Sequence, residues 1–394
     1  MSSALSGFRV LISGAGIAGP ALACFLNDAG AETTVVEIAP GLRNSGFAVD
    51  FRGPTHMRVL ERLGVLDELK AVQTHAGAMR TVDAAGRTIF ELPAEFAGGD
   101  VEVRRRDLTA VLHRRSADRT SYVFGDSIAT LRDGPDGVEV EFRSGRQVTY
   151  DAVIGADGIH STVRRLAIGP EDTFVKHLGY HIAGWDVPND VGALLAVSQA
   201  YNVPGRMASV AADDRDPDRA GAMVVWSSGA LGVGWLDVPA QKRAIHTAFA
   251  GLGWHVPKLL AGLTEVPDLY FDSISRVSVP RWHAGRVALL GDAAWGVTLG
   301  GMGVGTGVVG AYVLAGELAR TNGDPGTAFP AYEKWMRSFA GRWQKGASPG
   351  HFLAPSSRPG LWLRNTMFRR AAVRRLLVSS STSLASSADL PDYS

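Results

Sequence analysis

Apolar and polar positions follow one another along the first forty residues in the order strand, helix, strand. Residues 8–13 form a short apolar run that ends at a glycine cluster, and residues 15–29 have the apolar content of a buried helix. Residues 33–37 form a second, β-branched run that ends in an acid. This order predicts the opening β-α-β unit of a doubly wound α/β fold.

The following segments predict a second structural unit. Residues 79–92 have the pattern of a strand, a turn and a strand, a hairpin too long for a doubly wound connection. A helix is expected at residues 108–115, and alternation over residues 138–142 predicts a strand that returns at residues 148–150. Residues 152–154 then predict a buried strand.

The middle of the chain predicts a mostly antiparallel sheet. Between residues 175 and 275 the strand-type segments include residues 222–226 and 231–236, and the one convincing long helix is at residues 242–252. A buried strand at residues 287–290 marks the return to the first unit.

The last quarter of the chain predicts helices and a tail. Residues 308–320 have a helical pattern after a glycine-rich loop, and residues 361–378 form a basic helical stretch. We interpret its arginines as the solvated face of a packing helix, in preference to a site for nucleic acid or anionic lipid. The serine-rich segment from residue 379 has too little apolar content to fold.

Composition excludes several classes of protein. The 394 residues include 40 basic and 39 acidic side chains, with 46% hydrophobic residues, which excludes a disordered chain and a strongly basic nucleic-acid binder. Cys24 is the only cysteine, so an internal disulfide and a zinc or iron–sulfur ligand set are excluded and a cytoplasmic location is expected. The uncharged residues 293–316 contain eight glycines, which disfavour a membrane-spanning helix.

The strongest motif is a glycine fingerprint between the first predicted strand and helix. Gly14 permits a tight turn, Gly16 lets the backbone approach a pyrophosphate, and Gly19 lets the helix pack closely on the strand. Ile17 and Ala18 lie at the start of the helix, where free N–H groups bind phosphate. The setting predicts a dinucleotide site.

Glu37 at the end of the second strand adds to this prediction. A carboxylate at this position accepts hydrogen bonds from ribose hydroxyls. It would repel a 2′-phosphate, so NAD or FAD fits this pocket better than NADPH.

Three further motifs resemble the signatures of the class A flavoprotein monooxygenases, the single-component aromatic-hydroxylase family. They lie, in chain order, at residues 105–108, 153–164 and 286–294. Residues 310–318 are similar to the tetracycline-modifying branch of that family. Four ordered motifs at fitting spacings make chance a poor explanation of the set.

The resemblance implies a fold like that of p-hydroxybenzoate hydroxylase, an α/β fold in which a Rossmann-like FAD-binding domain carries an inserted, mostly antiparallel substrate domain and a C-terminal helix. We expect the FAD-binding domain in residues 1–75, 100–174 and 276–345. The other expected parts are the substrate domain (76–99 and 175–275), a C-terminal helical segment (346–378) and a flexible tail (379–394).

By the same resemblance, FAD is bound by residues of all these motifs. Asp292, with Gly291 before it, contacts the ribityl and pyrophosphate part of FAD, and Arg105 approaches FAD from another loop. Asp157, with Gly158 after it, lies where FAD and the nicotinamide donor are both sensed. In isolation, Asp157 also reads as a turn after a strand and Asp292 as a helix-entry cap.

The loop after these residues departs from the family pattern. The helix that begins at Gly303, Val304 and Gly305 is, by resemblance, aimed at the pyrimidine edge of the flavin, where its dipole stabilises negative charge. Between Ala294 and this helix the family has prolines beside the flavin, whereas this chain has Trp295 and no proline in residues 296–299. The stiffness of the wall over the flavin is therefore in question.

A loop at residues 46–53 corresponds to the family segment beside the flavin ring. Gly46 permits close approach, and Asp50 is expected near the flavin or the donor path. Arg43 either reaches the adenosine ribose or phosphate, or faces solvent.

Aromatic residues are the candidates for substrate binding. Trp185, Trp226 and Trp235 supply aromatic surface in the second domain. Trp295 is either a stacking partner or part of the core. The histidines show no metal-ligand arrangement, so no metal is expected.

Together these features predict an enzyme in which FAD is bound and NADH or NADPH is a transient donor. We expect it to use O2 to insert one oxygen atom into a bulky aromatic or polycyclic small molecule, in secondary metabolism or antibiotic modification, as a monomer or homodimer with no nucleic-acid or membrane partner. Two alternatives remain: an FAD-dependent dehydrogenase without oxygen insertion, and a flavin- or ligand-binding protein without turnover.

Overall fold

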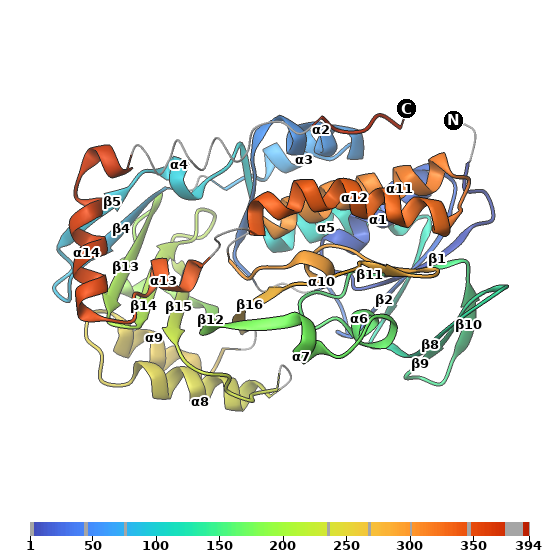
Figure 1. The fold of residues 1–394 in the computed structure, drawn as a ribbon. Coiled ribbons are helices and arrows are strands. Elements are labelled where there is room, and N and C mark those ends of the chain that lie inside the picture. Colours follow the sequence, from blue (N-terminus) through green and yellow to red (C-terminus); the bar gives the residue numbers. More distant parts are fainter. Residues whose placement is uncertain are drawn as a thin grey trace.

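The computed structural model describes residues 4–42, 46–74, 77–234, 237–266, 269–299, 302–344, 348–374 and 389–393. The molecule has two main parts, each built on its own large sheet, that lie side by side (Figure 1). Among the described residues, no helix combines the length and apolar content that crossing a bilayer requires.

The first sheet has six strands and is largely parallel. Its central strand β1 (Arg9–Ser13) pairs in parallel with β2 (Glu32–Glu37) and β11 (Ala152–Gly155). The order is β17-β18-β11-β1-β2-β7, completed by β17 (His283–Ala284), β18 (Val287–Leu289) and β7 (Thr120–Phe124). The middle residues of β1 are fully buried, as expected for a parallel sheet covered on both faces. The predicted doubly wound fold is confirmed.

Helices stack above this sheet in Figure 1, and a small sheet lies beneath it. α1 lies against α5 and α11, and α11 lies against α12 and α2. The bounds are α1 (Ala18–Asp28), α2 (Gly53–Leu63), α3 (Leu66–Ala71), α5 (Arg105–Ala117), α11 (Gly303–Arg320) and α12 (Pro325–Gln344). The small antiparallel sheet is formed by β8 (Ile128–Gly134), β9 (Gly137–Phe142) and β10 (Gln147–Tyr150).

The second large sheet has seven strands in the order β16-β12-β15-β14-β13-β4-β5, with β13 and β4 its one parallel pair. Its strands are β16 (Tyr270–Val277), β12 (Val175–Pro188), β15 (Arg219–Ser227), β14 (Arg206–Ala212), β13 (Val197–Val203), β4 (Ala78–Val82) and β5 (Thr88–Leu92). The hairpin predicted at residues 79–92 is therefore part of this sheet, next to strands more than a hundred residues later.

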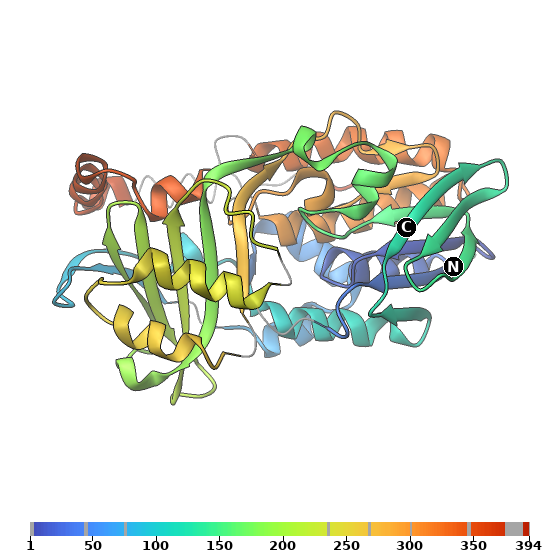
Figure 2. The same cartoon turned by 90° about the horizontal axis from the view of Figure 1, so that it is seen from below.

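Two helices cover one face of this sheet, as Figure 2 shows. They are α8 (Val238–Phe249) and α9 (Val256–Leu263), whose apolar side chains share a core with the sheet. On the other face, residues of α13 (Pro349–Leu353) join a separate apolar cluster, and α14 (Arg358–Phe368) lies against β5.

Two short strands and several short helices complete the fold. The pair β3 (Ala48–Phe51) and β6 (Val101–Arg104) is antiparallel. The remaining elements are α4 (Ala94–Ala97), α6 (Thr162–Ala167), α7 (Glu171–Phe174), α10 (Asp292–Trp295) and the 3-10 turn Asn189–Val191.

Three predictions in the second half of the chain were wrong. Residues 231–234 form no strand, because Gly232 has a positive φ of 61° and a second glycine, Gly234, lies two residues later; residues 235–236 lie outside the described part. The helix α9 was missed because the Pro257 at its first turn reads as a breaker. The basic helix ends at Phe368, with a further helical turn at residues 371–374.

The predicted flexible tail is also corrected over residues 389–393. The Tyr393 hydroxyl donates to Glu317 of α11 over 2.8 Å, the Tyr312 hydroxyl donates to the Pro391 carbonyl over 2.8 Å, and Asp392 pairs with Arg62 of α2. Polar and aromatic contacts thus hold a segment whose composition alone predicts no packing.

Candidate functional site

The glycine loop after β1 is shaped by backbone contacts. Gly14 has a φ of +110°, and a Cβ atom there would lie 2.5 Å from the Ala156 carbonyl oxygen. A Cβ at Gly19 would lie 2.0 Å from the Gly14 carbonyl oxygen, whereas one at Gly16 would meet no atom within 4 Å. Gly14 and Gly19 are therefore needed for packing, and Gly16 borders open space.

The start of α1 offers amide groups to a ligand. Ile17 is the N-cap residue and Ala18 the first helical residue, and the N-cap makes no side-chain hydrogen bond. First-turn N–H groups without helical partners, together with the helix dipole, attract phosphate.

Glu37 holds this loop from the end of β2. Its carboxylate accepts hydrogen bonds from the Ala15 amide (2.8 Å) and the Ala39 amide (3.0 Å). A carboxylate has about four acceptor positions, so capacity remains for the ribose hydroxyls predicted to bind there.

Asp157 caps α6. Its carboxylate accepts hydrogen bonds from the amides of Thr162 (2.8 Å) and Val163 (3.1 Å) and from the Ser161 hydroxyl. Burial raises the pKa of Asp157. Gly158 has a φ of +80°, which favours glycine, and a Cβ there would meet no atom within 4 Å. The structure thus gives this pair a defined role in shaping the loop, while its predicted part in sensing the donor stays a prediction.

Asp292 lies between Arg105 and the start of α11. A Cβ at Gly303 would lie 2.8 Å from an Asp292 carboxylate oxygen. Burial raises the pKa of Asp292, and the nearby Arg105 charge acts in the opposite direction. Within the described part of the chain, no hydrogen bond reaches the Asp292 carboxylate, so its oxygens can accept from a ligand hydroxyl.

The separate motifs meet at this place. A Cβ at Gly291 would lie 3.3 Å from the Ala18 Cβ, which brings the Gly291-Asp292 motif onto the start of α1. A Cβ at Gly46 would lie 2.8 Å from the Arg105 Cδ, which brings the loop before β3 to the arginine motif. Gly14, through Ala156, links the first motif to the second. The predicted cofactor residues of five segments are therefore neighbours.

His56 of α2 lies behind the first turn of α11, and sequence reasoning missed it. Its Nδ1 hydrogen-bonds to the Arg52 carbonyl, and a Cβ at Gly305 would lie 2.7 Å from its Nε2. His56 is fully enclosed, and burial lowers its pKa, so the imidazole is neutral. His56 therefore sets the spacing between α2 and residues 303–305, including Val304. A histidine on the apolar face of a helix gives no sequence signal for this role.

The proline-free loop after Ala294 is held by hydrogen bonds. The Val277 amide donates to the Gly296 carbonyl (2.8 Å), and the Thr298 amide donates to the Ser275 carbonyl (3.1 Å). The Thr298 hydroxyl donates to the Ser273 carbonyl (2.9 Å). The loop thus pairs with β16, the edge strand of the seven-stranded sheet.

Gln344 and Thr306 complete this arrangement. The Gln344 side-chain amide donates to the carbonyls of Trp295 and Val277, both over 2.8 Å. The Trp295 indole N–H donates to the Thr306 hydroxyl over 3.0 Å. The proline-free loop is thus held by polar contacts to β16, α11 and α12.

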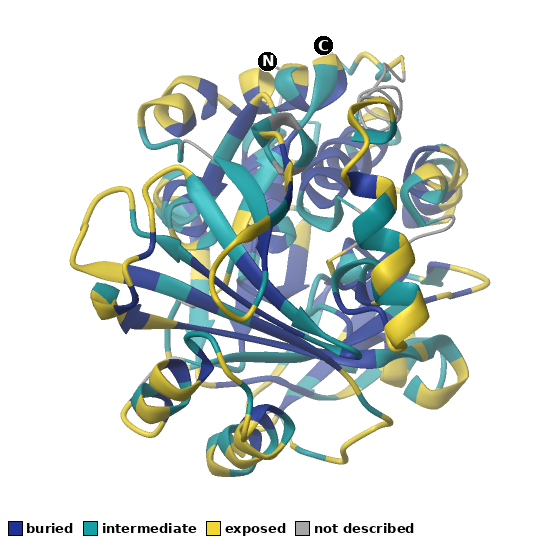
Figure 3. Ribbon diagram, turned by 90° about the vertical axis from the view of Figure 1, so that its left-hand side faces the viewer, coloured by how far each residue is buried: buried dark blue, intermediate teal, exposed yellow. Residues whose placement is uncertain are grey.

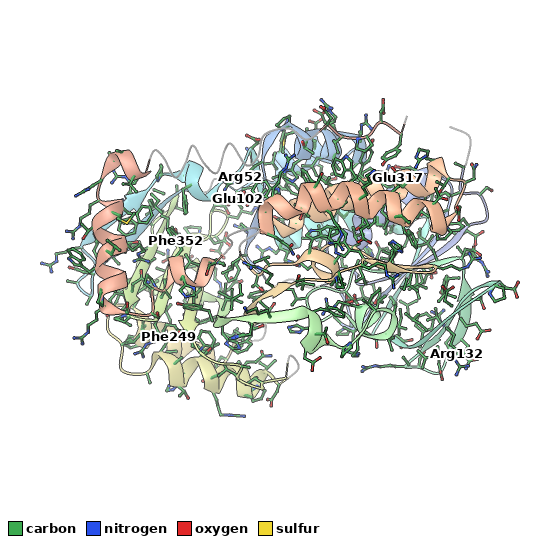
Figure 4. The ribbon with its side chains drawn as sticks, viewed as in Figure 1. Arg52, Glu102, Arg132, Phe249, Glu317 and Phe352 are labelled. Carbon is green, nitrogen blue, oxygen red and sulfur yellow. The ribbon has the colours of Figure 1, made fainter. Side chains whose placement is uncertain are left out.

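Three of the four predicted aromatic substrate residues, Trp185, Trp226 and Trp295, do not face this site. Trp185 and Trp226 belong to the core shared with α8 and α9, and Trp226 packs edge to face on Phe249 of α8, labelled in Figure 4, with ring centroids 6.0 Å apart. Trp295 is core, packed against Trp282 with centroids 4.7 Å apart. Their substrate-binding prediction is corrected, because side chains alternate between the faces of a strand.

The other face of the sheet meets the cofactor motifs instead. A Cβ at Gly184 would lie 2.6 Å from the Phe47 ring, and Phe47 packs on Tyr270 with ring centroids 5.1 Å apart. Met223 and Val225 join the same apolar cluster. Phe47 directly follows Gly46, so this face lies next to the Arg105 segment. The sequence signal for this face was the alternation of side chains along β12, in which Gly184 leaves a space on one side of the strand.

His160 joins the Asp157 loop to the sheet. Its Nδ1 lies 2.8 Å from a Glu171 carboxylate oxygen, and its Nε2 lies 3.6 Å from Asp272 of β16. These two acids raise the pKa of His160 to about 10. The charged imidazole therefore connects α7 to β16 of the seven-stranded sheet, beside the predicted site.

The placement of three predicted residues at this site stays a prediction. Asp50 pairs with Arg52, which Figure 4 labels beside Glu102 where the two main parts of the molecule meet. Arg43 and Trp235 lie outside the described residues.

The chemistry of these residues fits FAD. The loop leaves room at Gly16 for a pyrophosphate, Glu37 and Asp292 retain acceptor capacity for hydroxyls, and Arg105 is a cation beside them.

Comparison with known proteins bears on this fit. A family model described as an FAD-binding domain matches residues 8–219. A flavin-dependent monooxygenase of Legionella longbeachae is 34% identical over 343 residues, which are 86% of this chain and 87% of that protein.

Two solved structures have the same fold. The tetracycline destructase Tet(51) superposes with a TM-score of 0.82 at 30% identity, covering 98% of this chain and 99% of its own. The HpxO protein of Klebsiella pneumoniae, solved with FAD and uric acid, superposes with a TM-score of 0.75 at 20% identity over 97% of this chain and 98% of its own, which supports the fold alone.

Proposed function

Because this chain belongs to the class A flavin-dependent monooxygenase family, we propose that it takes electrons from NADH or NADPH and uses O2 to insert one oxygen atom into a bulky aromatic or polycyclic small molecule. The observation that carries the proposal is the convergence of Gly14, Asp292, Arg105 and Gly303 on one place beside the Phe47 face of the sheet.

The residues have distinct parts in this function. FAD, when bound, supplies the redox and oxygen chemistry. The amides after Gly14 bind phosphate, Glu37 accepts from ribose, and Asp292 and Arg105 hold the middle of the cofactor. The first-turn amides of α11 supply positive potential for negative charge that develops on the ring system. Each assignment is part of the proposal.

The face of the seven-stranded sheet that packs against Phe47 supports the proposed substrate class. Phe47, Tyr270 and Met223 are partly buried and offer aromatic and apolar surface, which suits a large apolar ring system. Tet(51), to which the chain is similar over nearly its full length, is named for destroying tetracycline, a polycyclic antibiotic. We propose a substrate of that size and aromatic character.

The wall formed by residues 296–298 excludes water in this proposal. Its hydrogen bonds to β16 keep it in place while a donor enters and leaves, and a dry site protects reactive oxygen chemistry from side reactions. The proposed domain limits are those stated from the sequence, except that residues 389–393 pack on α2 and α11. The buried thiol of Cys24 suits the proposed cytoplasmic location.

Purified protein tests the proposal. We expect a yellow protein that retains FAD, oxidises NADH or NADPH faster when aromatic polycyclic compounds are added, consumes O2, and yields a product heavier by one oxygen atom. A product without added oxygen would favour a dehydrogenase, and ligand binding without oxidation would favour sequestration.

A further inference from the structure

The outer face of α14 exposes three large apolar side chains. Trp362 is 68% exposed, Leu363 53% and Met367 44%. Leu363 and Met367 are four residues apart and lie on the same side of the helix, and Trp362 adjoins Leu363 in the chain; we call these three exposed residues the apolar stripe. Figure 3 views this side of the molecule and shows exposed residues along the front of α14. Contiguous apolar surface of this kind marks an interaction site.

The inner face of α14 is fixed, so the stripe is presented rigidly. Phe368 packs against Phe90 and Phe352, with ring centroids 5.6 and 5.5 Å apart. The Arg364 guanidinium donates to the Asn202 side chain (3.0 Å) and to the Phe352 carbonyl (3.0 Å). These contacts hold the helix against the sheet and leave Trp362 pointing away from it.

The charged side chains of α14 and its flanking residues are all of one sign. Residues 348–374 contain five arginines and no aspartate or glutamate. Arg358, Arg369 and Arg370 are exposed at the two ends of the helix. A second copy of the same face would bring these like charges together, which disfavours a symmetric dimer through α14. An anionic surface is complementary.

In place of the sequence-based expectation of a solvated packing face and no membrane partner, we propose that α14 docks the protein on the surface of an anionic lipid bilayer. Trp362, Leu363 and Met367 enter the headgroup region, where tryptophan is favoured, and the exposed arginines lie near the lipid phosphates. A helix of this kind lies in the plane of the membrane and needs no spanning segment. The partner is thus recognised by apolar insertion together with negative charge.

Vesicle sedimentation of the full-length FAD-loaded protein tests this proposal. We expect binding to vesicles of phosphatidylcholine mixed with phosphatidylglycerol, weaker binding to phosphatidylcholine alone, and loss of binding as salt rises. Replacing Trp362→Ser together with Leu363→Ser should lower the partition coefficient on the order of tenfold. Arg369→Gln with Arg370→Gln should reduce binding and its salt dependence.

Leu195→Ser is the matched control, because Leu195 is 58% exposed in a loop far from α14 in the sequence. It should leave vesicle binding unchanged, and retained FAD absorbance in every variant confirms folding. Failure to bind the anionic vesicles overturns the proposal, as does equal loss in the control. A dimer in light scattering that the Trp362→Ser, Leu363→Ser variant abolishes would assign the face to a second copy and also overturn it.

Discussion

The Thr298 hydroxyl donates a hydrogen bond to the Ser273 carbonyl over 2.9 Å and so joins the loop after Asp292 to the edge of the seven-stranded sheet. The same hydroxyl accepts from the Ser275 amide at 3.3 Å. One small side chain therefore couples the wall beside the proposed cofactor site to the sheet that faces the proposed substrate.

Thr298→Val should destabilise the protein by about 1–2 kcal/mol, since it removes the hydroxyl partner of one buried and one partly buried backbone group of β16. It should also weaken retention of FAD. Urea unfolding and fluorescence titration with FAD measure the two effects. Thr298→Ser keeps the hydroxyl and serves as the control; equal behaviour of the two variants would remove the coupling role from Thr298.

Gly305→Ala should lower FAD affinity roughly tenfold, because the added Cβ would lie 2.7 Å from His56 Nε2 and push the first turn of α11 away. His56→Ala in the same chain should restore part of the affinity. Gly262→Ala is the matched control: it lies in α9, its Cβ would meet no atom within 4 Å, and it should stabilise by about 0.5 kcal/mol. If the double variant binds no better than Gly305→Ala alone, the steric explanation fails.

Gly16→Val should abolish FAD binding while leaving the fold intact. The added atoms meet no protein atom within 4 Å at Cβ, but they fill the space proposed for the pyrophosphate. The expected result is a colourless protein with an unchanged circular dichroism spectrum. A yellow Gly16→Val protein would place the cofactor elsewhere.

The stability contributed by His160 should depend on pH. Its pKa is raised from 6.5 to about 10, chiefly by Asp272 and then by Glu171. Because the folded-state value is the higher one, the stabilisation is full below about pH 6.5, declines as pH rises from there, and is lost above about pH 10.

Half of the His160 side chain is exposed, so screening limits the effect to about 1 kcal/mol. His160→Gln should therefore lose about that much stability near pH 6 and almost none near pH 10 in urea unfolding. His246→Gln, on the exposed side of α8, is the control and should not reproduce this pattern. A pH-independent difference for His160→Gln would contradict the charged bridge.

Tyr393→Ala should destabilise by about 2 kcal/mol through loss of apolar contact, because its ring fills the space beside Gly316, where a Cβ would lie 2.1 Å away. Tyr393→Phe should lose about 1 kcal/mol with the hydrogen bond to Glu317, which Figure 4 labels on α11. Thermal unfolding measures both. Asp389→Ala, at an exposed position, is the control; equal melting temperatures for all three variants would mean that the tail contributes nothing.

Local chemistry made much of the cofactor side predictable. Gly14, Gly19 and Glu37 act through neighbours close to them in sequence or in the adjacent strand, so the strand-glycine-helix pattern carries the information. The resemblance to known motifs supplied Asp292 and Arg105, which no local pattern would have joined.

The substrate side was less predictable because burial, not residue type, decides which face is used. Trp185 and Gly184 are adjacent, yet they face opposite sides of β12, and only the position of α8 and α9 tells which side is covered. The pairing of Thr298 with β16 and the packing of His56 on Gly305 likewise depend on tertiary contacts between distant segments.

The order of strands in the parallel sheet has a consequence for biosynthesis. Neighbours β1, β11 and β18 come from residues 9–13, 152–155 and 287–289. The ribosome therefore releases Gly14 long before Asp292. The nascent chain holds the glycine loop but not yet Asp292 while the inserted sheet is being synthesised. FAD binding by the full set of proposed residues therefore has to wait until residue 292 has been synthesised.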